Sequence, residues 1–260
     1  MRIAVLQKQV PDRESPLRVS DDGRHFDEQQ VSFELNESDA YAIEEALQLK
    51  DRIGAETEII ALGLGPERIE KTLHQALARG ADRAIRILDD RELATDPFAV
   101  ASVFAAALKG QGCDLVLSGL QSDDLGMGQT GILLGELLGM ATASLVMATE
   151  PGTASIRVKC ELEGGWYQWL TVPLPASLSI QTGINQPRYP TIKGIMDAKR
   201  KPIEVLSASA LWSGEPLQTC QRLYVPHKAK HTEMIEGTPD QAAAQLVGIL
   251  KTGIKVLYSL

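Results

Sequence analysis

The chain has 260 residues, of which 44% are hydrophobic and 23% are charged, and its formal net charge is −8. This length and composition are typical of one large globular domain, or of one domain with an appendage. The acidic balance argues against nucleic acid as the main partner, because phosphate backbones attract basic surfaces.

The cysteines and the lengths of the apolar runs indicate the cellular compartment that we expect for the protein. Cys113, Cys160 and Cys220 are odd in number and widely spaced, so we expect neither a disulfide framework nor a structural zinc site. The first residues, MRIAVLQKQVPD, are typical of a strand rather than of a signal peptide. No apolar run approaches the ~20 residues that a spanning helix needs. We therefore expect a cytoplasmic protein without membrane insertion.

Residues 1–149 alternate between short apolar strand patterns and amphipathic helical patterns. Strands are predicted at residues 3–6, 57–64, 83–88, 114–119 and 143–149, and helices near residue 36, from Pro66, and over 97–109 and 129–138. A turn at Asp22–Gly23 predicts a hairpin over residues 17–27. This alternation predicts an α/β fold in which a parallel sheet carries helices on both faces. Ligands on such sheets bind beyond the carboxyl ends of the strands.

The helix that begins near Asn36 is amphipathic. Asn36 suits the N-cap position, and Glu37 and Asp39 suit the first turn, where the helix dipole favours acids. Glu44 and Glu45 are expected to face solvent, opposite an apolar stripe formed by Ala42, Ile43, Ala46 and Leu47.

After residue 150 the alternation ends. The pattern predicts a hairpin around Gly164–Gly165, a further strand, a proline-flanked segment with a short helix, and a terminal helix over 239–251. Residues 206–238 are expected to be irregular.

Three loops are expected to meet at the carboxyl edge of the sheet: residues 7–12, 63–66 and 119–130. The last of them, in the stretch GLQSDDLGMGQTG, joins an apolar strand to a helix and carries four glycines but no lysine. A helix N-terminus can bind an anion through its free N–H groups and its dipole alone. Asp123 and Asp124 would then brace loop N–H groups or meet a ribose hydroxyl. A capped loop without a ligand remains the alternative.

Signals for catalysis are weak. The chain has no G-x-S-x-G elbow, no Walker lysine and no H-E-x-x-H motif, so no catalytic residue is predicted. His227 and His231 are four residues apart, but Pro226 argues against the helix that a metal-binding pair would need. No metal site is therefore predicted.

The segment QPRYPTIKGIMDAKRK combines apolar and basic side chains in an otherwise acidic chain. It places Ile192, Ile195 and Met196 beside several lysines and an arginine. An apolar tip ringed by positive charge suits a docking surface, because the tip supplies contact energy and the charges steer association. An amphipathic crossover packed on the chain's own core explains the pattern equally well.

Several of these stretches occur together in one known family. KQVPD, NESDAYAIEEALQLK, LGLGPERIEKTLHQALARGADRAIRI, DLVLSGLQSDDLGMGQTG and NQPRYPTIKGIMDAKRK follow the order and spacing of the beta subunit of electron transfer flavoproteins, which the chain resembles over residues 1–205. The resemblance implies a Rossmann-like, adenine nucleotide alpha hydrolase-like domain over 1–205. It also implies a recognition loop at 186–202, and an extended C-terminal arm and helix at 206–260 that contact an alpha subunit.

The resemblance also implies a function. Such a beta subunit forms a heterodimer with an alpha subunit that carries the redox-active FAD. The pair accepts electrons from flavin-dependent dehydrogenases and passes them to a membrane quinone oxidoreductase or another acceptor. The beta subunit binds a structural AMP and has no substrate chemistry of its own.

The nucleotide-binding residues that the resemblance implies can be named by position, with the phosphate held by Gln129 and Thr130. They are Leu6, Asn36, Glu37, Ser38, Asp39, Leu64, Gly119, Gln121, Asp123, Asp124, Gly126, Gly128, Gln129 and Thr130. The docking residues are Ile192, Ile195 and Met196. Ile192 stands where well-known members have leucine, which leaves the identity of the partner open.

Two alternatives remain at this stage. Electron-bifurcating relatives hold a second FAD in the same pocket, interact with NADH, and often read DGDTAQVGP where this chain reads DDLGMGQTG. Thr130 and Gly131 favour the AMP form, whereas KQVPD is common among the bifurcating members. The other alternative is a stand-alone module that binds an adenine nucleotide.

Overall fold

The computed structural model describes residues 1–91, 93–226, 232 and 234–252. The chain divides into two units, Met1–Leu223 and Tyr224–Leu260. The described part of the second unit contains one helix, α7 (Pro239–Thr252). His227 and His231, which the sequence argued against as a metal pair, lie outside the described residues.

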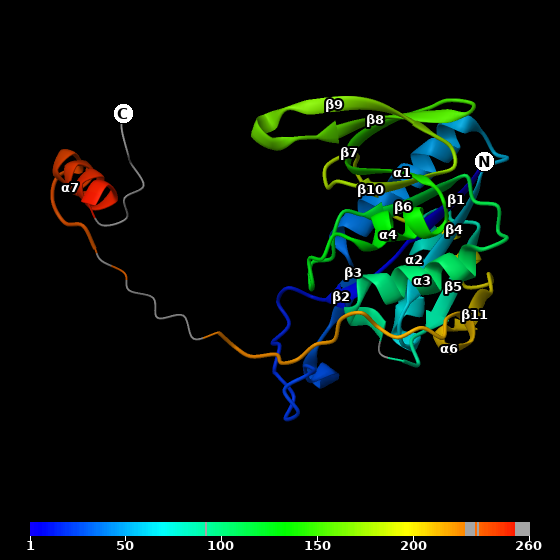
Figure 1. The fold of residues 1–260 in the computed structure, drawn as a ribbon, viewed down its shortest axis with the longest axis horizontal. Coiled ribbons are helices and arrows are strands. Elements are labelled where there is room, and N and C mark those ends of the chain that lie inside the picture. Colours follow the sequence, from blue (N-terminus) through cyan, green and yellow to red (C-terminus); the bar gives the residue numbers. More distant parts are fainter. Residues whose placement is uncertain (92, 227–231, 233, 253–260) are drawn as a thin grey trace. The chain divides into compact units, whose positions relative to one another are not determined.

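A nine-stranded sheet forms the centre of the first unit (Figure 1). Its spatial order is β11-β5-β4-β1-β6-β10-β7-β8-β9. The strands are β1 (Arg2–Leu6), β4 (Glu58–Leu64), β5 (Arg83–Leu88), β6 (Leu115–Gly119), β7 (Ala141–Pro151), β8 (Ser155–Glu161), β9 (Tyr167–Pro173), β10 (Ala176–Ile180) and β11 (Ile203–Ser207).

Seven of these strands run parallel, from β11 through β7, and β8 and β9 extend the same sheet in antiparallel pairing. The α/β class and the hairpin around Gly164 are thereby confirmed. The hairpin is a continuation of the sheet, visible at one side of it in Figure 1.

Helices cover both faces of the sheet, as the sequence predicted. α1 (Glu37–Ile53) and α2 (Glu70–Arg79) pack in one apolar cluster, and α3 (Pro97–Leu108) and α4 (Thr130–Leu137) pack in another. Successive side chains of β1 point to opposite faces of the sheet. Ile3 and Val5 therefore belong to the first cluster, and Ala4 and Leu6 belong to the second. Both faces of β1 are thus buried, which is usual for a parallel strand.

Smaller elements connect this framework. β2 (Gln9–Pro11) pairs antiparallel with β3 (Phe33–Leu35), and the predicted 17–27 hairpin is reduced to one bridge between Val19 and Phe26. The remaining elements are the 3-10 turns η1 (Glu28–Gln30), η2 (Glu67–Ile69), η3 (Leu93–Thr95) and η4 (Glu163–Gly165), with the short helices α5 (Ile192–Ala198) and α6 (Ala208–Leu211).

Three local expectations are wrong. Residues 206–238 are not irregular throughout, because β11 ends at Ser207 and α6 spans Ala208–Leu211. Pro66 caps the turn η2, and α2 begins only at Glu70, so Pro66 is not the first residue of an α-helix. Glu44 and Glu45 do not face solvent, because only 2% and 3% of their surfaces are exposed. Glu44 instead accepts from the guanidinium of Arg188, and Glu45 accepts from the side-chain amide of Asn185 and from Arg52 of the same helix. The helix therefore buries two charges that its own periodicity assigns to solvent.

Candidate functional site

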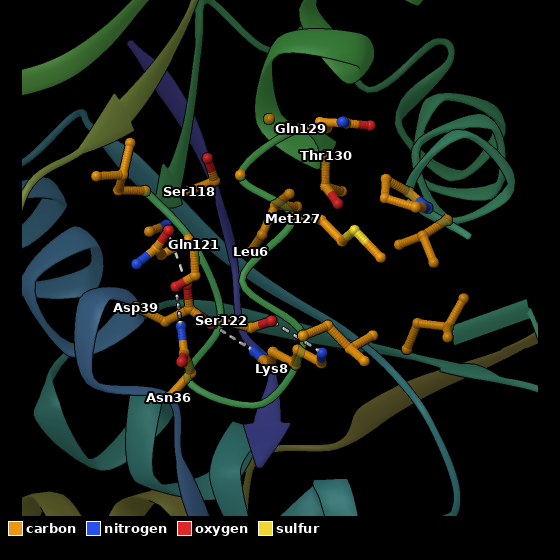
Figure 2. A pocket seen from close by; sticks show the side chains of 18 of the residues that line it. Leu6, Lys8, Asn36, Asp39, Ser118, Gln121, Ser122, Met127, Gln129 and Thr130 are labelled. Carbon is orange, nitrogen blue, oxygen red and sulfur yellow. Dashed lines mark hydrogen bonds between the residues drawn. The ribbon is translucent and has the colours of Figure 1, made fainter. Parts of the chain in front are cut away.

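A pocket opens at the carboxyl ends of β1, β4 and β6, where parallel α/β sheets bind their ligands (Figure 2). Its walls come from the start of α1, from the loop after β6, from the first turn of α4 and from one side of α3. The described lining residues are Leu6, Gln7, Lys8, Asn36, Asp39, Leu64, Ala94, Pro97, Val100, Phe104, Ser118, Gly119, Leu120, Gln121, Ser122, Leu125, Met127, Gly128, Gln129, Thr130 and Gly131.

Asp39 joins three of these elements. One carboxylate oxygen accepts the backbone N–H of Lys8 at 2.7 Å, and the other accepts the backbone N–H of Gly119 at 3.0 Å. The side chain therefore ties the first turn of α1 to the ends of β1 and β6. Burial raises the pKa of the Asp39 carboxyl to about 7, although the two N–H groups act in the opposite direction.

Asn36 and Ser38 fasten the loop that follows β6. The side-chain amide of Asn36 and the hydroxyl of Ser38 both donate to the backbone carbonyl of Gln121, at 3.0 and 2.6 Å. The side-chain oxygen of Asn36 accepts the backbone N–H of Asp123. Asn36 occupies the N-cap position of α1, but its side chain makes no capping hydrogen bond. The expected cap is thus a clamp on the loop 119–130.

The two loop acids are paired with groups from the N-terminal segment. Asp124 accepts from the Lys8 ammonium at 2.6 Å, and Asp123 accepts from the N–H of Glu37 at 3.3 Å and faces Arg13 at 3.5 Å. Burial would raise the pKa of Asp124, but Lys8 and the local hydrogen bonds hold it below its ordinary value. These contacts support the loop-bracing interpretation of the acids.

The N-terminus of α4 opens into the pocket. Gln129 is at the N-cap and its side chain makes no capping hydrogen bond, and the first N–H groups of a helix have no intrahelical acceptor. Gln129, Thr130 and Gly131 line the pocket. Gly126 and Gly128 turn the loop with positive φ angles of 62° and 64°. A Cβ on Gly131 would collide with the Ser118 hydroxyl, so only glycine lets α4 approach β6 this closely.

Polar and apolar groups divide the remaining pocket surface. The side-chain oxygens of Gln7 and Ser118 are buried and have no hydrogen-bond partner in the described structure. Val100 and Phe104 of α3 add an apolar wall, and Met127 adds a further apolar side chain from the loop. The pocket therefore suits a ligand with a flat apolar part, polar edge groups and an anionic end.

The implied nucleotide-binding residues fall into two groups. Those that line the pocket are Leu6, Asn36, Asp39, Leu64, Gly119, Gln121, Gly128, Gln129 and Thr130, and those that lie outside it in bracing or turn positions are Glu37, Ser38, Asp123, Asp124 and Gly126. The prediction for the loop 7–12 placed Gln7 and Lys8 at this edge of the sheet without giving either a role. Ser118 and the α3 wall were not predicted. The position of Ser118 near the end of the strand predicted at 114–119 was the available signal.

The implied docking residues lie away from this pocket, on α5. Ile192 is 81% exposed, Ile195 is 42% exposed and Met196 is 56% exposed, so the chain's own core does not cover them. The crossover alternative is therefore wrong for these three side chains.

Metal sites and membrane spans were also sought among the described residues. These residues contain no cluster of three histidine, cysteine or acidic side chains that could hold a metal ion. Within the same ranges, every helix is too short or too polar for a membrane span.

The raised pKa of Asp39 predicts a pH-dependent stability. The ordinary pKa of an aspartate is about 4, and that of Asp39 in the folded protein is about 7. Between these two pH values Asp39 keeps its proton in the folded protein and has lost it in the unfolded chain. The contribution of Asp39 to the free energy of unfolding is therefore highest below this window. It falls by about 1.4 kcal/mol per pH unit as the pH rises through it.

Urea unfolding of the wild type and of the non-titrating variant Asp39→Asn, from pH 5 to 8, measures this slope. The wild-type free energy of unfolding minus that of the variant should fall up to about pH 7 and then level off. A difference that stays flat across the range would show that the carboxyl is already ionised at pH 5.

Comparison with known proteins shows the family of the chain. Residues 24–211 match the family model described as the electron transfer flavoprotein domain. The chain is 35% identical over 259 residues to the electron transfer flavoprotein subunit beta of Methylophilus methylotrophus, covering 96% of this chain and 98% of that protein. It is 33% identical to the subunit beta of Bacillus subtilis (strain 168), covering 99% and 100% of the two chains. It is 34% identical to that of Syntrophomonas wolfei, covering 98% of each. The chain belongs to the beta-subunit family of electron transfer flavoproteins.

Proposed function

We propose that this chain is the structural, partner-docking half of an electron carrier. It pairs with an alpha subunit that carries the redox-active FAD, and it holds AMP in the pocket beyond β1, β4 and β6. The pair accepts electrons from flavin-dependent dehydrogenases and delivers them to a membrane quinone oxidoreductase or another acceptor. The chain itself performs no substrate chemistry.

The observation that carries the AMP assignment is the uncapped N-terminus of α4 in a pocket with little free positive charge. Of the described lining residues Lys8 alone is cationic, and its ammonium is already paired with Asp124. A phosphate would be held by the N–H groups at Gln129 and Thr130. Backbone donors suit a permanently bound nucleotide, because no transition-state charge has to be stabilised.

The rest of the pocket fits the nucleoside part of the same ligand. The buried oxygens of Gln7 and Ser118 lack partners in the described structure, and a ligand with donor groups would satisfy them. Val100 and Phe104 suit the face of a purine. AMP supplies no redox chemistry here, and its binding would stabilise the loop 119–130 between α1 and α4.

The nucleotide content of the purified heterodimer tests this assignment. We expect denaturation to release one AMP and one FAD per heterodimer, separated by chromatography and identified by mass. Two FAD molecules and no AMP would instead favour the bifurcating alternative with NADH as reductant. A colourless protein that purifies without an alpha subunit would favour the stand-alone module.

The docking role rests on the exposed side chains of α5. Ile192 and Met196 stand out from a segment that carries Lys193, Lys199 and Arg200, in a protein with net charge −8. Exposed apolar side chains of this size commonly act as interface hot spots when a partner encloses them. We therefore assign the contact with dehydrogenases to this segment.

Truncation of Ile192 should weaken docking without altering the fold. We expect Ile192→Ala in the heterodimer to raise the KM for a flavin-dependent dehydrogenase that reduces the wild type by about tenfold or more, a hot-spot loss of about 1.4 kcal/mol or more. Stopped-flow measurement of flavin reduction gives this value. Leu17→Ala, at a leucine that is 55% exposed within residues 1–205 and lies outside α5, is the matched control. Equal KM values for the two variants would contradict the docking role.

A further inference from the structure

The segment that leads into α5 is fastened to α1 through Glu44. This carboxylate accepts the Arg188 backbone N–H at 3.0 Å, the Arg188 Nε at 3.0 Å and the terminal guanidinium nitrogen at 3.0 Å. Only 3% of the Glu44 side chain is exposed, whereas 37% of the Arg188 side chain is. Asp51, about two helical turns after Glu44 on α1, accepts from the same guanidinium at 2.9 Å. These hydrogen bonds fix both the backbone and the side chain of Arg188.

The neighbouring acid holds the same segment at a second point. Glu45 accepts from the side-chain amide of Asn185 at 3.1 Å, and that amide also donates to the carbonyl of Tyr41 at 3.1 Å. The other Glu45 oxygen accepts from Arg52 and Thr149, at 2.6 and 2.5 Å. Residues 185–188 thus run along α1 with their path set by two buried carboxylates.

α5 itself packs against α2, which belongs to the same apolar cluster as α1. Gly194 lies so close to the Ala78 carbonyl of α2 that a Cβ there would collide with it. Ala198 is buried, and the Lys201 ammonium donates to the carbonyl of Ala81 at 2.8 Å. Arg79 completes the connection by donating to the carbonyl of Arg188 at 3.3 Å. The segment is therefore held before, within and after α5, while Ile192 stays exposed.

We propose that Glu44 is a positioning residue for partner docking: its bidentate pair with Arg188 holds residues 185–189 so that α5 presents Ile192 in a preformed arrangement. This inference rests on the docking role proposed for α5. A side chain that is already ordered loses less conformational entropy on binding, so preorganisation increases affinity without adding a contact. The planar guanidinium matches a carboxylate in a way that an ammonium cannot.

Two variants test the proposal in the complete heterodimer. Glu44→Gln removes the negative charge of the carboxylate. Arg188→Lys keeps the positive charge but removes the planar guanidinium that pairs with both Glu44 oxygens, and it leaves the sequence of α1 unchanged. Glu56→Gln, at an exposed acid just after α1, is the matched control. We expect both test variants to increase amide hydrogen exchange in residues 186–198 about tenfold, and to raise the KM for the same dehydrogenase to a similar extent. The kcat should stay within about twofold, because the docked complex is unchanged.

The outcomes separate this inference from the proposed function. If exchange and KM in both variants match the Glu56→Gln control while Ile192→Ala still raises the KM, then Glu44 has no positioning role and docking by α5 stands. If exchange increases but neither these variants nor Ile192→Ala change the KM, then α5 is not the docking segment and the proposal fails with it. A fall in kcat at unchanged KM would also overturn the proposal.

Discussion

Both carboxylate oxygens of Asp39 accept backbone N–H groups, from Lys8 at the end of β1 and from Gly119 at the end of β6. The pocket depends on this interaction, because it fixes the distance between two strand ends and the first turn of α1. A buried carboxyl pays a desolvation cost that its two donors offset only in part, which is why its pKa is raised to about 7. Asn36 and Ser38, from the same turn, then hold the loop that leads to the open end of α4.

α1 connects this pocket with the proposed docking segment. Its first turn contacts the loop 119–130, and its middle carries Glu44 and Glu45, which hold residues 185–188. The same rigid element therefore bears on both functional regions. A nucleotide that stabilises the first turn of α1 would also stabilise the support of α5. In the proposed electron carrier, this connection would give a redox-inert AMP a structural role.

The sequence predicted what local periodicity controls. The buried strands such as Ile3–Leu6 and the glycine loop before α4 follow from apolar patterning and turn chemistry, and family motifs implied nine of the 21 residues that line the pocket. Ion pairs between residues far apart in the sequence could not be predicted in this way. Lys8 meets Asp124 across 116 residues and Glu44 meets Arg188 across 144. The helical periodicity of α1 assigns Glu44 to solvent. The α3 wall was not predicted, because Val100 and Phe104 join the other lining residues only in the folded chain.

The proposed function requires that the pocket hold a nucleoside monophosphate at the N-terminus of α4. Phosphorus NMR of the intact, native heterodimer tests it most directly, because phosphate monoesters and pyrophosphates resonate separately. We expect one monoester signal, which does not titrate because the phosphate is enclosed by N–H donors, beside the pyrophosphate signals of a single FAD. Two sets of pyrophosphate signals without a monoester signal would contradict it.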